Sequence, residues 1–130
     1  CLATNSTLHL VDPLGFDISD SRVKRAGLDY WKYLQLIRHK SIEIFLDSLP
    51  TDASTVFFST KAKKSLYAKE FKKGSYLIFG CETKGLGEEL IEKFSKDTFN
   101  IPQYDDRVRS LNLANAASIV VYEAIRQLGH

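Results

Sequence analysis

The sequence contains no methionine, only two cysteines and no long apolar run. Translation starts with methionine, so we do not expect Cys1 to be the native start, and we expect a segment upstream of it. Cys1 and Cys81 lack metal-ligand or redox spacing, which predicts free thiols in place of a disulfide framework or a zinc site. Nothing approaches the ~20 apolar residues that a membrane helix needs, and the first residues do not form a secretory signal. These absences predict a soluble, cytoplasmic protein.

Neither sign of charge dominates the 130 residues, of which 44% are hydrophobic and 26% charged, with a formal net charge of +2. No repeat, low-complexity segment or Pro/Gly/Ser linker divides the chain, so we predict a single domain over residues 1–130. Basic residues cluster at 22–25 and at 61–73. Taken alone, such clusters are more typical of a solvated face than of a nucleic-acid site.

Short apolar runs alternate with helical patterns along the chain. Buried strands are predicted at Leu8–Val11, Thr55–Ser59, Tyr76–Phe79 and Phe99–Ile101. Helices are predicted at 22–26 with a cap from Asp20 or Ser21 and an end at Gly27, at 41–49 with a Ser41 cap, at 88–96, and at 110–128 with an end at Gly129. The last helix carries one apolar face, formed by Leu113, Ala117, Val120, Ala124 and Leu128. This alternation predicts an α/β fold with a mostly parallel sheet and helices on both faces.

Open α/β sheets bind ligands at the carboxyl ends of their strands. Three such ends lie at 58–60, 80–87 and 101–110. The segment 80–87 is a glycine loop between a strand and a helix, but it matches neither a Walker loop nor G-x-G-x-x-G. Its glycines are interpreted equally well as turn residues and as ligand contacts. A dinucleotide or triphosphate site is therefore not favoured.

Polar residues at the start of the last helix form a second candidate constellation. Ser110 is either an N-cap or a ligand contact, and Asn112 and Asn115 lie close enough on the helix to hold a polar ligand together. Glu82 is the acid of the glycine loop, and local backbone amides are its alternative partners. His9 is predicted in a strand, His39 at a helix end and His130 at the terminus. No nucleophile accompanies them, so a hydrolytic triad is not predicted.

Three stretches together resemble one family. They are 12–16 with 22–30, then Tyr76-Leu-Ile-Phe-Gly-Cys-Glu-Thr-Lys-Gly-Leu86, and finally 101–102 with Arg109-Ser-Leu-Asn-Leu-Ala-Asn115 through 124. In order and spacing they resemble the tRNA (cytidine/uridine) 2′-O-methyltransferase branch of the SPOUT superfamily. The resemblance implies a C-terminal trefoil knot and a homodimer, for which the apolar face of the last helix is the expected seam. It also implies methylation of a ribose 2′-hydroxyl at the tRNA wobble nucleotide, without a metal.

The resemblance assigns roles residue by residue. It implies that S-adenosylmethionine contacts Phe58, Gly80, Ile101 and Ser110. It places Glu82, Asn112 and Asn115 as catalytic residues that face the sulfonium or the incoming ribose. RNA contacts are expected at Arg22, Lys24, Arg25 and Tyr122, mainly to phosphates.

The resemblance stops short of one family segment, Asn-x-Gly-Asn-x-x-Arg, which follows the first strand and would lie upstream of Cys1. We therefore expect the 130-residue chain to methylate tRNA poorly unless those residues are present. Two other classes stay open: a catalytically silent fragment or RNA-binding module that keeps the knotted cofactor pocket, and a flavodoxin-like nucleotide-binding domain. The sequence predicts neither the wobble base nor the tRNA species, and ribosomal RNA is an alternative substrate.

Overall fold

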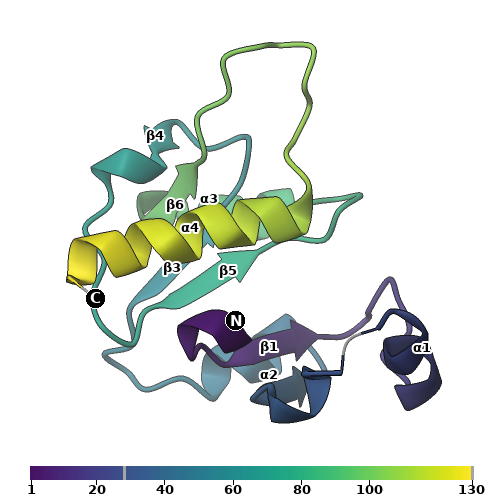
Figure 1. The fold of residues 1–130 in the computed structure, drawn as a ribbon. Helices are drawn as coiled ribbons and strands as arrows, with labels where there is room; N and C mark the ends of the chain where they lie inside the picture. The colour runs from purple at the N-terminus through teal and green to yellow at the C-terminus, as the bar shows by residue number, and fades with distance from the viewer. Residues whose placement is uncertain (28, 130) are drawn as a thin grey trace. The chain divides into compact units, whose positions relative to one another are not determined.

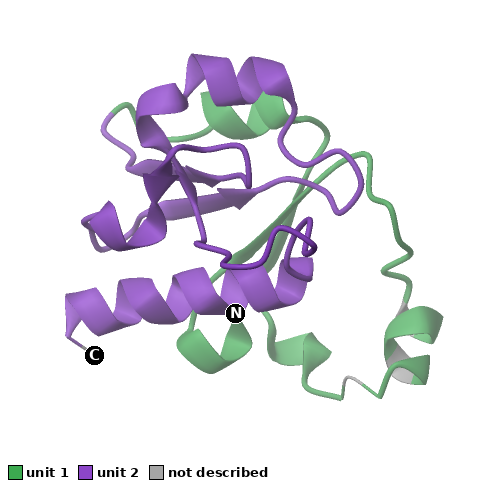
Figure 2. Cartoon of the chain, turned by 90° about the horizontal axis from the view of Figure 1, so that it is seen from above, with its two compact units in different colours: residues 1–51 green, residues 52–130 purple. Residues whose placement is uncertain are grey.

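The structure is a computed structural model that describes residues 1–27 and 29–129, with the backbone alone for Asp20 and Lys24. Leu28, which belongs to the stretch 22–30, lies outside the described residues, as do His130 and the side chain of Lys24. The chain forms two compact units, residues 1–51 and 52–130 (Figure 2). A single domain over the whole chain therefore stays a prediction, and each unit is described by itself.

The first unit is built on two parallel strands, β1 (Leu8–Val11) and β2 (Leu36–His39). The strand at 8–11 was predicted, whereas β2 was not, because Arg38 and His39 interrupt its apolar pattern. Two helices accompany the strands, α1 (Asp20–Arg25) and α2 (Ile42–Asp47), and 3₁₀ turns occupy Leu2–Thr4 and Trp31–Tyr33. Ser41 caps α2 as predicted, since its hydroxyl accepts a hydrogen bond from the Ile44 amide at 3.2 Å.

The α1 helix corrects one detail of the prediction. Asp20 is its first helical residue, and the Ser19 carbonyl accepts hydrogen bonds from the amides of Arg22 and Val23. The helix therefore begins earlier than expected, so that neither Asp20 nor Ser21 occupies the capping position. Its predicted end is confirmed, because Gly27 has the left-handed φ of 71° that is common just after a helix.

His9 and His39 form a pair within the first unit. His9 Nδ1 and His39 Nε2 lie 2.9 Å apart, and both rings contact the buried Phe45. His39 therefore belongs to a strand and not to a helix end as predicted. Burial, followed by the neighbouring His39, lowers the pKa of His9 below its ordinary 6.5. The folded protein consequently binds fewer protons than the unfolded chain just below pH 6.5.

Acid should therefore destabilise the first unit. We expect the free energy of unfolding to fall as the pH drops below about 6.5, because protonation of His9 costs more in the folded state. Urea unfolding at pH 7.5 and pH 5.5 measures this change. The variant His9→Phe keeps an aromatic ring against Phe45 but cannot titrate, so its loss should be smaller. An equal loss in both proteins would show that His9 does not cause it.

The second unit contains a four-stranded sheet of order β4-β6-β3-β5, in which every pair is parallel. Its strands are β3 (Thr55–Phe58), β4 (Lys64–Ser65), β5 (Tyr76–Phe79) and β6 (Thr98–Asn100). Its helices are α3 (Glu88–Lys93) and α4 (Leu113–Leu128), with 3₁₀ turns at Leu66–Ala68 and Ser95–Asp97. Helix α4 crosses one face of the sheet and α3 lies on the other (Figure 1). The predicted α/β class and parallel sheet are confirmed.

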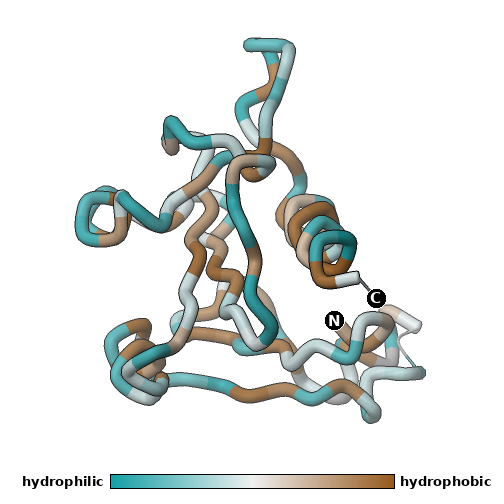
Figure 3. Tube along the Cα trace, turned by 90° about the vertical axis from the view of Figure 1, so that its left-hand side faces the viewer, coloured by the Kyte–Doolittle hydropathy of each residue, from teal (hydrophilic) through white to brown (hydrophobic). Residues whose placement is uncertain are grey.

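Alternating side chains of the strands fill the two faces of this sheet. On the α4 face, Val56 and Phe58 belong to a cluster with Val120 and Ala124 of the helix. On the other face, the fully buried Phe57 stacks on Phe94 with ring centroids 4.3 Å apart. The two central runs of this sheet are correspondingly hydrophobic, as the brown stretches of the trace in Figure 3 illustrate, whereas β4 is polar. One strand therefore holds both layers together.

Helix α4 departs from the prediction at its start and in its packing. It begins at Leu113 and is capped by Asn112, whose Oδ1 accepts from the Asn115 amide at 3.2 Å, so Ser110 is not the cap. Val120 and Ala124, at the centre of the expected dimer seam, are buried in the core of their own chain. That seam is therefore wrong, because its centre is already covered. Among the described residues, no helix is both long and apolar enough to cross a membrane.

A side-chain clamp fixes the crossover between β3 and β5 to α4. Gln127 Oε1 accepts a hydrogen bond from the Phe71 amide at 3.0 Å, while its Nε2 donates to the Lys69 carbonyl at 2.9 Å. Both bonds span more than fifty residues of sequence. Because a half-buried amide satisfies two backbone groups at once, the lysine-rich crossover is held against α4.

Candidate functional site

A pocket of about 420 Å³ lies at the carboxyl ends of β6, β3 and β5, which are neighbours in the sheet. Its volume falls in the range of small-molecule sites. The segments that form it are 58–61 after β3, the glycine loop after β5 and the loop before α4, together with the first turn of α4. All of them belong to the second unit. The prediction that these three strand ends meet is confirmed.

The glycine loop folds back on itself at the pocket wall. The Gly85 amide donates to the Cys81 carbonyl at 2.9 Å, and Gly85 adopts a left-handed φ of 64°. A Cβ on Gly80 would collide with the backbone of Gly85 and Leu86. Gly80 must therefore be a glycine because the backbone of Gly85 and Leu86 folds back against it. The group that closely approaches Gly80 is thus protein backbone. The exposed Cys81 thiol has its pKa lowered, chiefly by a hydrogen bond from the Lys84 backbone.

Apolar side chains line the inner side of the pocket. Phe58 and Phe79 stack with ring centroids 5.0 Å apart, and Ile101, Leu111 and Leu113 complete this surface. Such a surface suits a flat, partly apolar ligand group.

One polar group in the pocket stands out. The side-chain oxygen of Gln103 is the one buried side-chain polar atom without a hydrogen-bond partner among the described residues. Leaving such an atom unsatisfied costs about 1–3 kcal/mol, and Gln103 is one of the residues that line the pocket.

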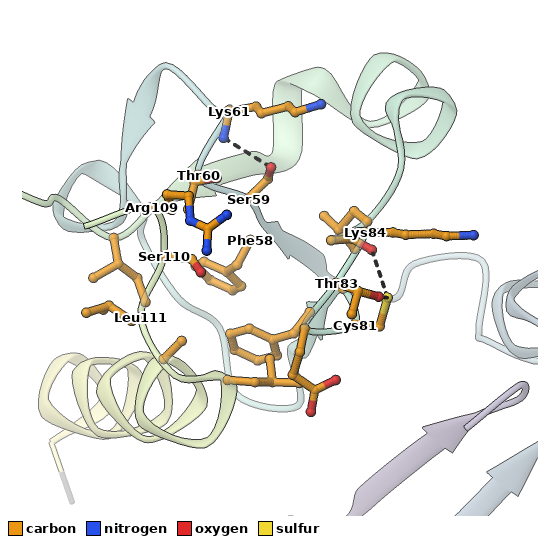
Figure 4. A pocket seen from close by; sticks show the side chains of 18 of the residues that line it. Phe58, Ser59, Thr60, Lys61, Cys81, Thr83, Lys84, Arg109, Ser110 and Leu111 are labelled. Atoms are coloured by element: carbon orange, nitrogen blue, oxygen red, sulfur yellow. Dashed lines mark hydrogen bonds between the residues drawn. The ribbon is translucent and has the colours of Figure 1, made fainter. Parts of the chain in front are cut away.

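The mouth of the pocket is polar and exposed. Lys61 Nζ lies 3.3 Å from Glu88 Oε1, which links the end of β3 to the start of α3, but both side chains are mostly in solvent. Such an exposed pair contributes little to stability. Figure 4 shows Arg109 and Ser110 extending from the loop before α4 towards Phe58, whereas the side chain of Lys84 points away. A basic group is therefore available at the entrance.

The structure brings together most of the predicted site residues. The four expected cofactor contacts, with Glu82, all line the pocket: Phe58, Gly80, Ile101 and Ser110. Asn112 and Asn115 do not line it. They belong to the capped start of α4, where Asn112 Oδ1 already accepts the Asn115 amide. Their neighbours Leu113 and Ala116 do line the pocket.

The expected RNA contacts lie in both units. Arg22 and Arg25 are exposed on α1, where Arg22 lies 3.7 Å from Asp17 in an exposed ion pair. Tyr122 is 58% exposed on α4. These side chains are accessible to a large ligand.

Thr60, Gln103 and Arg109 lie in the predicted strand ends 58–60 and 101–110 and line the pocket, but sequence reasoning did not single them out. Lys61 lies one residue beyond the predicted strand end and was missed, although its position next to that end was a usable signal. Gln103 and Arg109 could not be singled out, since their placement depends on the path of the loop before α4.

Comparison with known proteins identifies the family. The model of the SpoU rRNA Methylase family matches residues 1–122. The chain belongs to this family. The predicted resemblance is thereby confirmed, and the family match runs across both compact units.

SpoU relatives cover nearly the whole chain. The tRNA (cytidine(34)-2′-O)-methyltransferase of Burkholderia cenocepacia (strain HI2424) is 40% identical over 131 residues, which cover 99% of this chain and 83% of the relative. A solved structure described as giving structural insights into the 2-OH methylation of C/U34 on tRNA is 48% identical, with a TM-score of 0.86 over 94% of this chain and 78% of that one.

A more distant SpoU structure contains the cofactor. The methyltransferase AviRb from Streptomyces viridochromogenes, solved in complex with AdoMet, is 25% identical. Its TM-score is 0.81 over 97% of this chain and 49% of that one.

Proposed function

We propose that this protein transfers a methyl group from S-adenosylmethionine to the ribose 2′-hydroxyl of the wobble nucleotide of tRNA. The observation that carries the proposal is the pocket at three adjacent strand ends, in a chain 40% identical to a tRNA (cytidine(34)-2′-O)-methyltransferase. A catalytically silent module is not favoured, because relatives named as methyltransferases align with almost the entire chain.

The pocket residues fit S-adenosylmethionine. Phe58 and Ile101 offer apolar surface to the adenine, and the unsatisfied Gln103 oxygen can accept a hydrogen bond from an amino group. Ser110 adds a hydroxyl, and Gly80 keeps the glycine loop folded beside the ligand. The exposed Glu82 carboxylate provides the negative charge that a sulfonium favours.

Catalysis by these residues is mainly alignment. Bound S-adenosylmethionine supplies the methyl group and its leaving group, so the protein must hold the ribose oxygen in line and accept its proton. We assign the proton acceptor to Glu82 at the rim of the pocket. We assign the ribose contact to Asn115. Asn112 positions Asn115, because it caps the start of the helix by accepting the Asn115 amide hydrogen bond.

RNA is proposed to bind along exposed basic and aromatic residues. Arg22 and Arg25 contact phosphates, and Tyr122 offers an exposed ring. Lys24, whose side chain lies outside the described residues, is proposed as a third phosphate contact from its sequence position alone. We also propose that the protein is a homodimer in which each chain forms one methyltransferase domain. We place it in the cytoplasm. We place the dimer interface on the outer side of α4, where Ile119 is exposed. The proposed fold also includes a trefoil knot formed by β6 and α4.

A methyl-transfer assay tests the function. The protein purified at its native length, given labelled S-adenosylmethionine and an unmodified anticodon stem-loop, should incorporate one methyl group per RNA, and mass spectrometry should locate it on the wobble ribose. The matched control is the same RNA with a 2′-deoxy wobble nucleotide, which lacks the accepting oxygen. Incorporation into that control, or methylation of a base, would refute the proposed reaction.

A further inference from the structure

A second hollow of about 410 Å³ adjoins the pocket on the side of β4 and β6. It lies between the segment that follows β3 and the end of β6, and it shares three residues with the pocket: Thr60, Ile101 and Gln103. Asn100 Nδ2 donates to the Ala62 carbonyl at 2.6 Å, which ties its two walls together. A molecule in this hollow would therefore touch the wall of the cofactor pocket.

The residues around this hollow are neutral or basic: Thr60, Lys63, Ser65, Asn100, Ile101, Pro102 and Gln103. Lys63 contributes an ammonium group, and Thr60 and Ser65 contribute hydroxyls that can donate hydrogen bonds. Ile101 and Pro102 add apolar surface. An ammonium with hydroxyl donors suits a phosphate, and the apolar surface beside it suits a sugar or a base.

Lys63 differs from Lys61, Lys64 and Lys69 on the crossover, because no partner is found for its ammonium group among the described residues. Lys61 pairs with Glu88, while Lys64 lies over the Phe99 ring and donates to the Lys96 carbonyl. Lys69 also lies over the Phe99 ring, at 5.6 Å. Within the part of the chain that the structure describes, Lys63 has neither an ion pair nor a hydrogen bond. Its charge is therefore available to a ligand.

We propose that this hollow binds the nucleotide next to the methylated one, with Lys63 contacting its phosphate. The inference rests on the proposed function, because the methylated ribose must lie at the mouth of the cofactor pocket. An RNA strand that enters that mouth continues over the shared residues Thr60 and Gln103 into the hollow. The hollow thus fixes the register of the RNA, while the pocket holds the cofactor.

The test compares Lys63→Gln with Lys73→Gln. Both variants remove one positive charge from the same crossover, but Lys73 lines neither hollow. We expect Lys63→Gln to weaken binding of the anticodon stem-loop about tenfold and to reduce the slope of log K against log salt by about 0.7, as for one phosphate on a single strand. KM for RNA should rise, while kcat stays within about twofold.

A chemical change in the RNA locates the contact. Stem-loops with one methylphosphonate on either side of the wobble nucleotide lack a single phosphate charge. At the linkage that Lys63 contacts, this RNA should bind wild-type protein as weakly as normal RNA binds Lys63→Gln, and the two changes together should add no further loss.

Three results would overturn the inference. Equal losses in Lys63→Gln and Lys73→Gln would indicate diffuse attraction without a subsite. Weaker binding of S-adenosylhomocysteine to Lys63→Gln would assign the hollow to the cofactor. Wild-type protein that does not methylate the stem-loop would overturn the proposed function together with the subsite, whereas the first two results leave that function intact.

Discussion

Gly80→Ala should weaken cofactor binding strongly while the rest of the fold persists. The added methyl group would occupy the space of the Gly85 carbonyl group and the Leu86 amide, so the glycine loop must move away from β5. Inserting a methyl group into such a packed site costs about 1–3 kcal/mol, and the displaced loop takes one wall of the pocket with it. We expect the Kd for S-adenosylhomocysteine to rise about 100-fold by calorimetry, with a matching loss of methyl transfer.

The control for this variant is Gly15→Ala in the first unit. A Cβ at Gly15 would meet nothing within 4 Å, and Gly15 is not among the glycines with a positive φ. Its substitution should leave both cofactor binding and the thermal midpoint nearly unchanged. Unchanged cofactor affinity in Gly80→Ala would show that the return of the loop does not shape the pocket.

Local patterns predicted the elements whose sequences are strongly apolar. The runs 55–58 and 76–79 are β-branched or aromatic, and the structure has strands there within one residue of the prediction. The strands β2 and β4 escaped prediction for the opposite reason. Lys64–Ser65 is wholly polar, and it pairs with β6 because the fold brings it to the edge of the sheet.

The start of α4 shows where sequence reasoning reaches its limit. Ser110 and Asn112 are both good capping residues, and local preference does not distinguish between them. The structure selects Asn112, which leaves the Ser110 hydroxyl at the pocket. The choice follows from where the loop after β6 meets the sheet, which is a tertiary effect. The same loop places Gln103 and Arg109, so neither was singled out within the predicted segment 101–110.

The strand ends themselves were predictable, because parallel strands direct their carboxyl ends to one edge. The positions 58, 80 and 101 follow this rule without any knowledge of the loops. The rule does not predict which residues of one strand line the pocket and which pack in the core. Adjacent residues of β3 point to opposite faces, and of Phe57 and Phe58 only Phe58 lines the pocket.

Substitutions at the adjacent residues Phe57 and Phe58 should distinguish an effect on stability from an effect on cofactor binding. Phe57 is 0% exposed and stacks on Phe94, whereas Phe58 is 6% exposed, stacks on Phe79 and lines the pocket. Replacing either ring by alanine should lower the free energy of unfolding by about 3–5 kcal/mol, because each leaves a cavity in a packed layer. Only Phe58→Ala also removes apolar surface from the ligand.

Urea unfolding and calorimetry together measure the two effects. We expect similar destabilisation in both variants, with S-adenosylhomocysteine affinity reduced at least about tenfold in Phe58→Ala and within about threefold of wild type in Phe57→Ala. Binding must be measured at low temperature, where both variants stay folded. The variant Phe58→Leu, which keeps an apolar wall, should recover part of the affinity. Equal losses of affinity in the two alanine variants would mean that binding follows overall stability. Phe58 would then not be a specific contact of the cofactor.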